Sequence, residues 1–306
     1  MFEKSNQRDQ IEVSSEDTTF NVIKREMIKD KLAFISFVFI IFLVVMIFIV
    51  SLIADSTEAF QNNFNFDEWN LPPSFRHVLG TDGLGRNRII LLIFAARNTL
   101  MVVASIVVIS SVLGIIYGLI SGYIGGFVDS VMMRIIECLV VFPNFVVIIV
   151  VIIISGGFTI PLFIITTSLL TWMPIATVVR TRVRQEKELE YIQASRTLGT
   201  SHFKIIFHQL LPNLSTVIIA SITLNAVSIT GIETGFTFLF SRFGFLAHIF
   251  SPSLGTLIAS TGTMIVLRFY PLEWLPAVVL IVLIMFSINN IGEMLSRAAD
   301  PRQRHG

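Results

Sequence analysis

Six long apolar stretches dominate this chain and limit the folds that are open to it. A helix needs about 20 apolar residues to cross the hydrocarbon core of a bilayer, and the first stretch provides this length without a single charge. Because 54% of the 306 residues are hydrophobic and only 14% are charged, the sequence predicts an all-α integral membrane protein with six transmembrane helices. The six stretches are residues 32–54, 99–120, 135–155, 160–179, 214–238 and 274–291.

The segments outside these spans set the predicted boundaries. Residues 1–31 are polar and charged, so we expect a tail with an amphipathic lead-in to the first span and no cleaved signal peptide. Residues 254–267 are apolar but only about 14 residues long, which favours an interfacial or re-entrant helix over a seventh span. The other predicted parts are a loop at residues 55–98, a core of five further spans at 99–297 and a tail at 298–306.

The distribution of basic residues predicts the orientation in the membrane. With six spans, 16 of the 22 Lys and Arg residues fall on the side of the two termini. Loops rich in Lys and Arg stay in the cytoplasm, so we expect both termini there, together with the loop at residues 181–213. Four arginines of the loop at 55–98 run against this rule. We interpret residues 87–97 as a helix on the membrane surface, whose arginines reach lipid headgroups or polar groups of the protein.

Small residues and prolines predict how the spans pack. Gly114, Gly118 and Gly122 recur every four residues along the second span. This spacing places them on one face and lets another helix approach closely. Pro143 and Pro174 interrupt the third and fourth spans, and a proline there frees a backbone carbonyl and bends the helix. We expect static bends, although bent helices also line transport pathways.

A polar island at residues 190–213, with the sequence EYIQASRTLGTSHFKIIFHQLLPN, separates the fourth and fifth spans. Glycine suits the left-handed turn that ends a helix, and proline ends the next one. We therefore predict a short helix to about residue 198, a break at Gly199, and a second short helix that runs through residue 211 and stops at Pro212. Two short helices between spans form a compact projection, which suggests a soluble partner.

This island resembles the cytoplasmic coupling loop of ATP-binding-cassette importer permeases, in which Glu-Ala-Ala and a glycine precede a hydrophobic segment closing in Leu-Pro. The matching residues here are Gln193-Ala194-Ser195, Gly199 and Leu211-Pro212. Over residues 77–302 the chain is similar to the C-type permease subunits of oligopeptide or dipeptide importers, although Asn87 stands where that family usually has Asp. The further matches lie in order at residues 77–86, 122–134, 142–143, 230–239, 252–255 and 300–302.

The resemblance implies a type I importer permease fold and a set of partners. Two ATPase chains would dock on the coupling loop, a second related permease would complete the pathway, and an extracytoplasmic peptide-binding protein would deliver cargo. No GxxxxGK[ST] loop occurs in the sequence, so we expect ATP and Mg²⁺ on the ATPase chains and no cofactor here. Membrane lipid is the remaining expected partner, and nucleic acid is not expected. The residues implied in coupling are Glu190, Gln193, Ala194, Ser195, Arg196, Gly199 and Pro212.

Three polar residues inside the spans are candidates for the transport pathway, namely Asn144, Asn225 and Glu233. An ionisable group within a membrane is a functional candidate by default. Glu233 could equally cap neighbouring backbone, and hydrogen bonds between helices would also explain the two asparagines. Glu137 follows Arg134 by three residues, a spacing that favours a structural ion pair.

The sequence lacks the motifs of an enzyme. Its five histidines form no HExxH motif, and no GxSxG elbow is present. We therefore expect a non-catalytic transport subunit. A permease for glutathione, a metal chelate or a signalling peptide is also compatible with these motifs. An ion-coupled secondary transporter or channel would carry more ionisable groups within its spans.

Overall fold

The computed structural model describes residues 19–53, 68–242, 252–259 and 264–299. Within these ranges the chain is helical apart from turns and one isolated bridge between Thr81 and Asn87. The predictions for residues 1–18, 54–67, 260–263 and 300–306 lie outside the described residues. The principal helices are α2 (Thr19–Lys29), α3 (Lys31–Ile53), α5 (Arg88–Ile124), α6 (Gly126–Val140), α7 (Asn144–Ile154), α8 (Ile160–Thr171), α9 (Met173–Glu186), α13 (Ser215–Arg242) and α16 (Leu275–Ala298).

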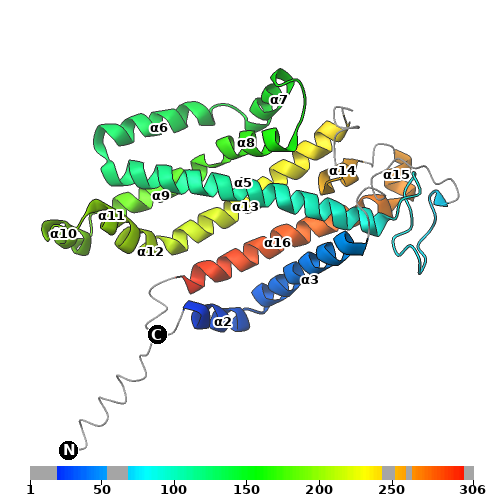
Figure 1. Cartoon of the computed structure of the whole chain (residues 1–306), viewed down its shortest axis with the longest axis horizontal. Coiled ribbons are helices and arrows are strands. Elements are labelled where there is room, and N and C mark those ends of the chain that lie inside the picture. The colour runs from blue at the N-terminus through cyan, green and yellow to red at the C-terminus, as the bar shows by residue number, and fades with distance from the viewer. Residues whose placement is uncertain (1–18, 54–67, 243–251, 260–263, 300–306) are drawn as a thin grey trace, which may run out of the picture.

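Five of the six predicted spans correspond to helical stretches of sufficient length and apolarity, and α8 and α9 together form one of these five. The bent pair α6 and α7 makes a sixth only when its two helices are counted as one span. The 23 residues of α3 extend about 35 Å at 1.5 Å per residue, which covers a hydrocarbon core of about 30 Å. Figure 1 shows the long helices running side by side along the long axis of the molecule.

Helix α5 is longer than the second predicted span. Its 37 residues begin at Arg88, so the expected surface helix at 87–97 is wrong, and this segment forms the first turns of α5. The reason is local: no helix breaker follows Asn87, whose side chain caps α5 by accepting from the N–H of Ile89 at 3.1 Å. The expected contact of its arginines with polar groups is confirmed by Arg88, which pairs with Glu273.

The two interrupting prolines act differently. Pro143 precedes α7, and the axes of α6 and α7 diverge by 79° at this break, so the third span is sharply broken. Pro174 lies in the first turn of α9, where its missing N–H costs little, and α8 continues into α9 as one span.

The apolar stretch at 254–267 forms two short helices, α14 (Leu254–Ala259) and α15 (Met264–Phe269). Neither is long enough to span a membrane.

The glycine stripe of α5 packs against α9, as its spacing predicts. A Cβ atom on Gly118 would lie 2.6 Å from the carbonyl oxygen of Ala176 and 2.8 Å from the Cβ of Val179. Gly114 and Gly122 approach α9 just as closely, one turn to either side. Ordinary contacts of a Cβ atom lie beyond about 3.4 Å, so only glycine permits this helix separation.

The helices define two ends of the bundle. Figure 1 shows α2, the segment that includes α10 to α12 and the end of α16 at one end, which we call the knob end, and residues 68–87, α14 and α15 at the other, which we call the loop end. At the knob end Arg297 donates to Asp30, which joins α16 to the start of α3. The backbone N–H of Ala33, followed by Arg297, holds the pKa of Asp30 below its usual range.

Candidate functional site: a knob anchored to the bundle

The polar island forms a compact projection, the knob, at residues 187–214. Its first helix is α10 (Glu190–Thr197). The N–H of Gly199 donates to the carbonyl oxygen of Arg196 and the N–H of Thr200 to that of Ser195, each at 3.0 Å. These two bonds form a Schellman motif, which requires a left-handed residue, and Gly199 supplies it with φ of 78°. The predicted break at Gly199 is confirmed, and α9 continues to Glu186, so the first residues of the predicted loop at 181–213 are helical.

The second helix of the knob changes its winding along its length. It consists of α11 (His202–Ile205), a π-helical turn at Ile206–Leu210 and α12 (Leu211–Asn213). Pro212 lies inside this last turn and does not stop the helix before it, so the predicted stop at Pro212 is early. Pro212 is the second residue of α12, which follows directly on the π-helical turn.

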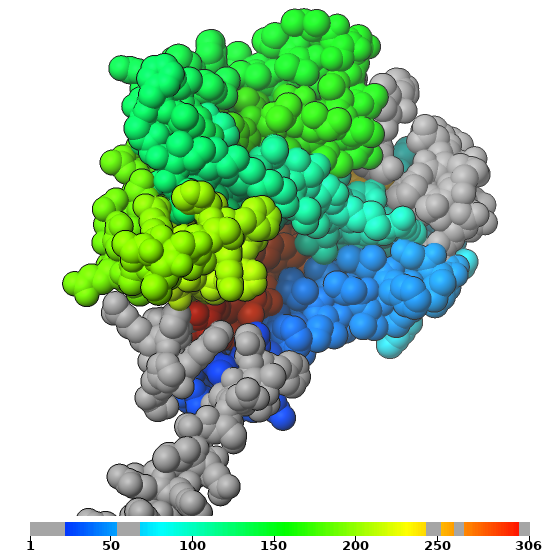
Figure 2. Space-filling view, turned by 60° about the vertical axis from the view of Figure 1, so that its left-hand side comes forward, coloured from blue at the N-terminus to red at the C-terminus, as the bar shows by residue number. Residues whose placement is uncertain are grey.

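Apolar side chains anchor the knob to the bundle. Ile192 of α10, together with Ile205 and Leu210, is fully buried against a cluster that includes Val179 and Val183 of α9. Burying a side chain of this kind stabilises a contact by about 1.5–3 kcal/mol in an aqueous environment. The knob is therefore packed onto the end of α9 as well as linked to it by the chain. Figure 2 shows it in yellow-green as a raised block beside the red end of α16.

Polar contacts fix the two helices of the knob to each other. Gln209 donates to the Oγ of Ser195 at 2.9 Å, and Asn213 donates to the hydroxyl of Tyr191 at 2.8 Å. Tyr191 in turn donates to Glu186 at the end of α9 at 3.0 Å. Partial burial raises the pKa of the Tyr191 hydroxyl above its ordinary value. It therefore keeps its proton at neutral pH and remains the donor in this chain of bonds.

A third contact ties the knob to the end of α5. The hydroxyl of Tyr123 lies 2.7 Å from the Nδ1 of His202, and the guanidinium of Arg196 stacks over the Tyr123 ring at 5.0 Å from its centroid. Such cation–π contacts contribute about 0.5–1 kcal/mol at exposed sites. The side chain of Arg196 thus turns toward the bundle and holds the knob in place.

The predicted coupling residues divide between two faces of the knob. Ser195 and Arg196 are half-buried and make the contacts described above. The outward face is formed by Glu190, Gln193, Ala194, Gly199 and Pro212, which are all exposed.

Sequence reasoning missed the apolar part of this outward face. Leu198 is 84% exposed and Phe203 72% exposed, and the Phe203 ring packs against the tilted ring of Phe207 with centroids 4.4 Å apart. Apolar side chains this exposed at a loop tip indicate a binding surface.

Two of the three pathway candidates line one open pocket between α7, α9 and α13. Asn144 at the start of α7 and Asn225 of α13 both line a cavity of about 230 Å³. Asn225 also donates to Ser110 of α5 at 3.1 Å. Residues of α9, including Pro174 and Ile175, complete one wall. The remaining polar lining side chains are Thr171, Ser221 and Ser228.

Glu233 lies elsewhere, in a buried junction toward the loop end. Its carboxylate accepts from the hydroxyls of Thr99 and Thr234, each at 3.4 Å, and it is 2% exposed. Thr99 also accepts from the N–H of Leu254 at 3.1 Å. Glu233 therefore joins α13 to α5 and, through Thr99, to α14. Its assignment to the pathway stays a prediction, as do those of the two asparagines.

An ion pair that sequence reasoning did not identify links α6 to α9. Asp129 is 5% exposed and accepts from the Nε and Nη2 of Arg180, while Ser121 donates to it at 2.5 Å. The turn that brings Asp129 back beside Ser121 is made by Gly125, which ends α5 with φ of 72°. The predicted pair of Arg134 and Glu137 is confirmed at 3.0 Å but is exposed. The buried pair is therefore the one that joins different elements.

Comparison with known proteins identifies two families that this chain matches. Residues 114–305 match the family described as the binding-protein-dependent transport system inner membrane component. Residues 20–73 match the N-terminal transmembrane domain of oligopeptide transport permease C. Together these two matches cover most of the chain, including the knob and every helix that lines the cavity.

Individual relatives agree with the family match. The oligopeptide transport system permease protein OppC of Lactococcus lactis subsp. cremoris is 37% identical over 281 residues, which cover 92% of this chain and 94% of that protein. The dipeptide transport system permease protein DppC of Bacillus subtilis is 32% identical over 244 residues, covering 78% and 72%. The oligopeptide transport system permease protein AmiD of Streptococcus pneumoniae is 32% identical over 233 residues. The chain therefore belongs to the family of inner-membrane components of binding-protein-dependent transport systems, as a non-catalytic, multi-pass permease subunit.

Proposed function

We propose that this chain is the C-type permease subunit of an ATP-driven importer of oligopeptides or dipeptides. The observation that carries the proposal is the 37% identity to an oligopeptide permease across 94% of that protein's length. The family works with ATPase and binding-protein partners. For this chain we infer two ATPase chains at the knob, a second related permease across the pathway, and a peptide-binding protein at the loop end. ATP and Mg²⁺ would be held by the ATPase chains.

The orientation follows from the same proposal. The knob end, with both ends of the described chain, would face the cytoplasm, in keeping with its content of Lys and Arg. Labelling tests this directly. The single cysteine, Cys138, is first replaced by alanine, and a new cysteine is introduced at the exposed Thr197 of the knob. A membrane-impermeant maleimide should label Thr197→Cys only after the cells are opened. Labelling of intact cells would refute the orientation and the ATPase docking with it.

The outward face of the knob is suited to docking because it combines apolar anchors with polar neighbours. Leu198 and Phe203 present bulky side chains to solvent, and exposed apolar anchors of this kind carry much of the free energy of binding in protein interfaces. Ala194 beside them is small and permits close seating against a partner. The buried side of the knob would pass the displacement on, since Ile192 packs against the end of α9.

Docking is tested with two variants, each of which places one negative charge at a different end of the molecule. Leu198→Asp should weaken co-purification of the ATPase chains at least tenfold and abolish ATP-driven peptide uptake, because it puts a charge into an apolar contact. Val78→Asp is the matched control, since Val78 is also apolar and 58% exposed but lies at the loop end. It should leave co-purification unchanged. Normal co-purification and uptake with Leu198→Asp would refute the assignment of this face.

A further inference from the structure

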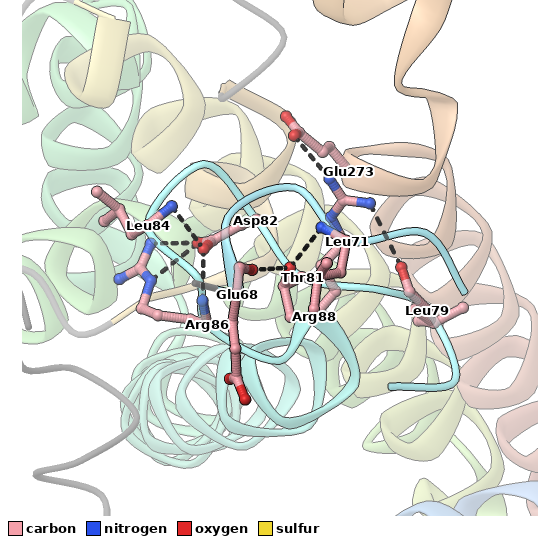
Figure 3. Close-up of polar contacts among 9 residues, drawn as sticks. All are labelled: Glu68, Leu71, Leu79, Thr81, Asp82, Leu84, Arg86, Arg88 and Glu273. Atoms are coloured by element: carbon pink, nitrogen blue, oxygen red, sulfur yellow. Dashed lines mark hydrogen bonds and ion pairs between the residues drawn. The ribbon is translucent and has the colours of Figure 1, made fainter. Parts of the chain in front are cut away.

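A second site lies at the loop end, where several elements surround a cavity of about 250 Å³. Its walls come from residues 79–88, the first turns of α5, the end of α13, residue 252 with α14, and the segment at 272–277 that begins α16. Two arginines and two carboxylates line it, Arg86 with Asp82 and Arg88 with Glu273. Figure 3 shows the two pairs close together on the inner side of the loop.

The loop is built to hold these side chains in place. Asp82 accepts from the backbone N–H groups of Leu84 and Arg86 and from the Nε of Arg86 at 2.8–2.9 Å. A Cβ atom on Gly80 would lie only 2.4 Å from the carbonyl oxygen of Leu71, and the φ of Gly80 is 75°. The turn therefore requires glycine. The part of the loop that carries Asp82 and Arg86 is therefore fixed by its own hydrogen bonds.

Arg88 is the unusual member of the group. It is only 9% exposed, and its Nη2 donates to Glu273 at 2.9 Å. Its Nη1 reaches the carbonyl oxygen of Leu79 at 3.4 Å, which is a long bond. Its Nε has no hydrogen-bond partner among the residues that the structure describes. A donor of a buried guanidinium that has no hydrogen-bond partner costs free energy. A carboxylate is the acceptor that best satisfies such a donor.

We propose that this cavity receives an aspartate or glutamate side chain of the extracytoplasmic binding protein, which bonds to Arg88 in competition with Glu273. The inference rests on the proposed function, since it takes the binding protein to dock at the loop end. The same loop supports a protein partner, because Arg76 is exposed and Trp69 and Phe75 expose aromatic rings on it. Arginine and aromatic residues are enriched in protein interfaces.

The position of the cavity gives such a contact a consequence inside the bundle. Arg88 is the first residue of α5, and Glu273 lies in the turn before α16. Pro252, another lining residue, accepts a hydrogen bond from Asn98 of α5 at 2.9 Å. A carboxylate that replaces Glu273 on Arg88 would release the turn before α16 from α5. Docking of the partner would thereby change the contact between two membrane-spanning helices.

The test compares two substitutions that both break the Arg88–Glu273 pair. The complete complex is reconstituted in lipid nanodiscs, and its affinity for the binding protein is measured with and without peptide. Arg88→Gln removes the group that receives the carboxylate and should weaken binding more than tenfold. Glu273→Gln removes the competing carboxylate and should tighten binding about five- to tenfold. Arg134→Gln, at an exposed pair with Glu137 on α6 and away from the loop end, should change binding less than threefold.

Opposite signs for the two substitutions support the proposal, whereas a purely structural pair would be weakened by both. If Arg88→Gln fails to assemble, Glu273→Gln decides alone, since unchanged or weaker binding overturns the proposal. An effect that requires bound peptide would assign the carboxylate to the cargo and overturn it as well. Failure of the proposed function is distinguishable, because the unsubstituted complex would then show neither binding-protein affinity nor ATP-driven uptake.

Discussion

The contact between α5 and α9 provides the sharpest test of the packing, because it can be changed by one methyl group. Gly118→Ala adds a Cβ atom 2.6 Å from the carbonyl oxygen of Ala176, 2.8 Å from the Cβ of Val179 and 3.0 Å from the N of Arg180. All three are backbone or Cβ atoms, so no side chain can rotate away. To reach an ordinary separation of about 3.4 Å, the two helices must move apart by several tenths of an ångström.

The loss in the free energy of unfolding expected for Gly118→Ala follows from these distances. Overpacking a well-packed contact costs about 1–3 kcal/mol, and alanine recovers up to about 1 kcal/mol through its better helix propensity. The net expectation for Gly118→Ala is a loss of about 1–2 kcal/mol in the free energy of unfolding. Gly231 of α13 is the matched control, since nothing lies within 4 Å of its Cβ position. Gly231→Ala should therefore be neutral or stabilising by up to about 1 kcal/mol.

The assay is thermal unfolding of the two purified variants in the same detergent, with the unsubstituted chain as reference. Gly118→Ala should lower the midpoint temperature and Gly231→Ala should leave it unchanged or raise it. Because α9 continues into the knob, Gly118→Ala should also reduce ATP-driven uptake by the reconstituted complex. If Gly118→Ala unfolds at the same temperature as Gly231→Ala or above it, the close approach of α5 and α9 is not as the structure has it.

Three further substitutions test other contacts. Asp129→Asn leaves Arg180 partly buried beside a neutral group and should cost roughly 3–5 kcal/mol in thermal unfolding, whereas equal stability would contradict the buried pair. Gly292→Ala places a Cβ atom 2.0 Å from the Oγ1 and 2.5 Å from the Cβ of Thr223; adding Thr223→Gly, which removes both atoms, should restore part of the lost stability, whereas Thr223→Ala keeps the Cβ clash and should not. Asp30→Asn should destabilise the chain at neutral pH, because the pKa of Asp30 is lowered in the folded chain. The stability difference should be full above the ordinary pKa of aspartate and disappear as the pH falls through the lowered one.

The spans and the knob were predictable because they depend on local properties of the sequence. Length and apolarity identify a membrane helix without reference to its neighbours. The break at Gly199 follows from one residue's ability to adopt a positive φ, and Asn87 caps a helix as well as the Asp common in the family. The start of α5 differs from the prediction, because the arginines at 86–97 run against the positive-inside rule and point to a separate surface helix. In the structure Arg88 pairs with Glu273, which is distant in sequence, and Arg86 pairs with Asp82 of the same loop.

Tertiary contacts decided the features that sequence reasoning could not resolve. Pro143 and Pro174 carry the same local constraint, yet only the first breaks its span. The helix around Pro174 packs against the glycines of α5, and the carbonyl oxygen of Trp172 lies 2.7 Å from the Cβ position on Gly114. This contact holds the backbone in line. In the knob, Ile205 is buried and Phe203 exposed, and no local pattern distinguishes which of them faces the bundle.

The geometry of α9 shows why the knob and the cavity belong to one mechanical unit. Its 14 residues extend about 21 Å at 1.5 Å per residue. Ile175 at one end lines the cavity, and Val183 near the other end packs in the cluster that buries Ile192 of the knob. A helix held by backbone hydrogen bonds does not compress over this distance, and the glycine contact with α5 limits its sideways movement. If the knob is the docking site proposed above, we expect its displacement to reach the wall of this pocket through α9, and to reach α6 through the ion pair of Arg180 with Asp129.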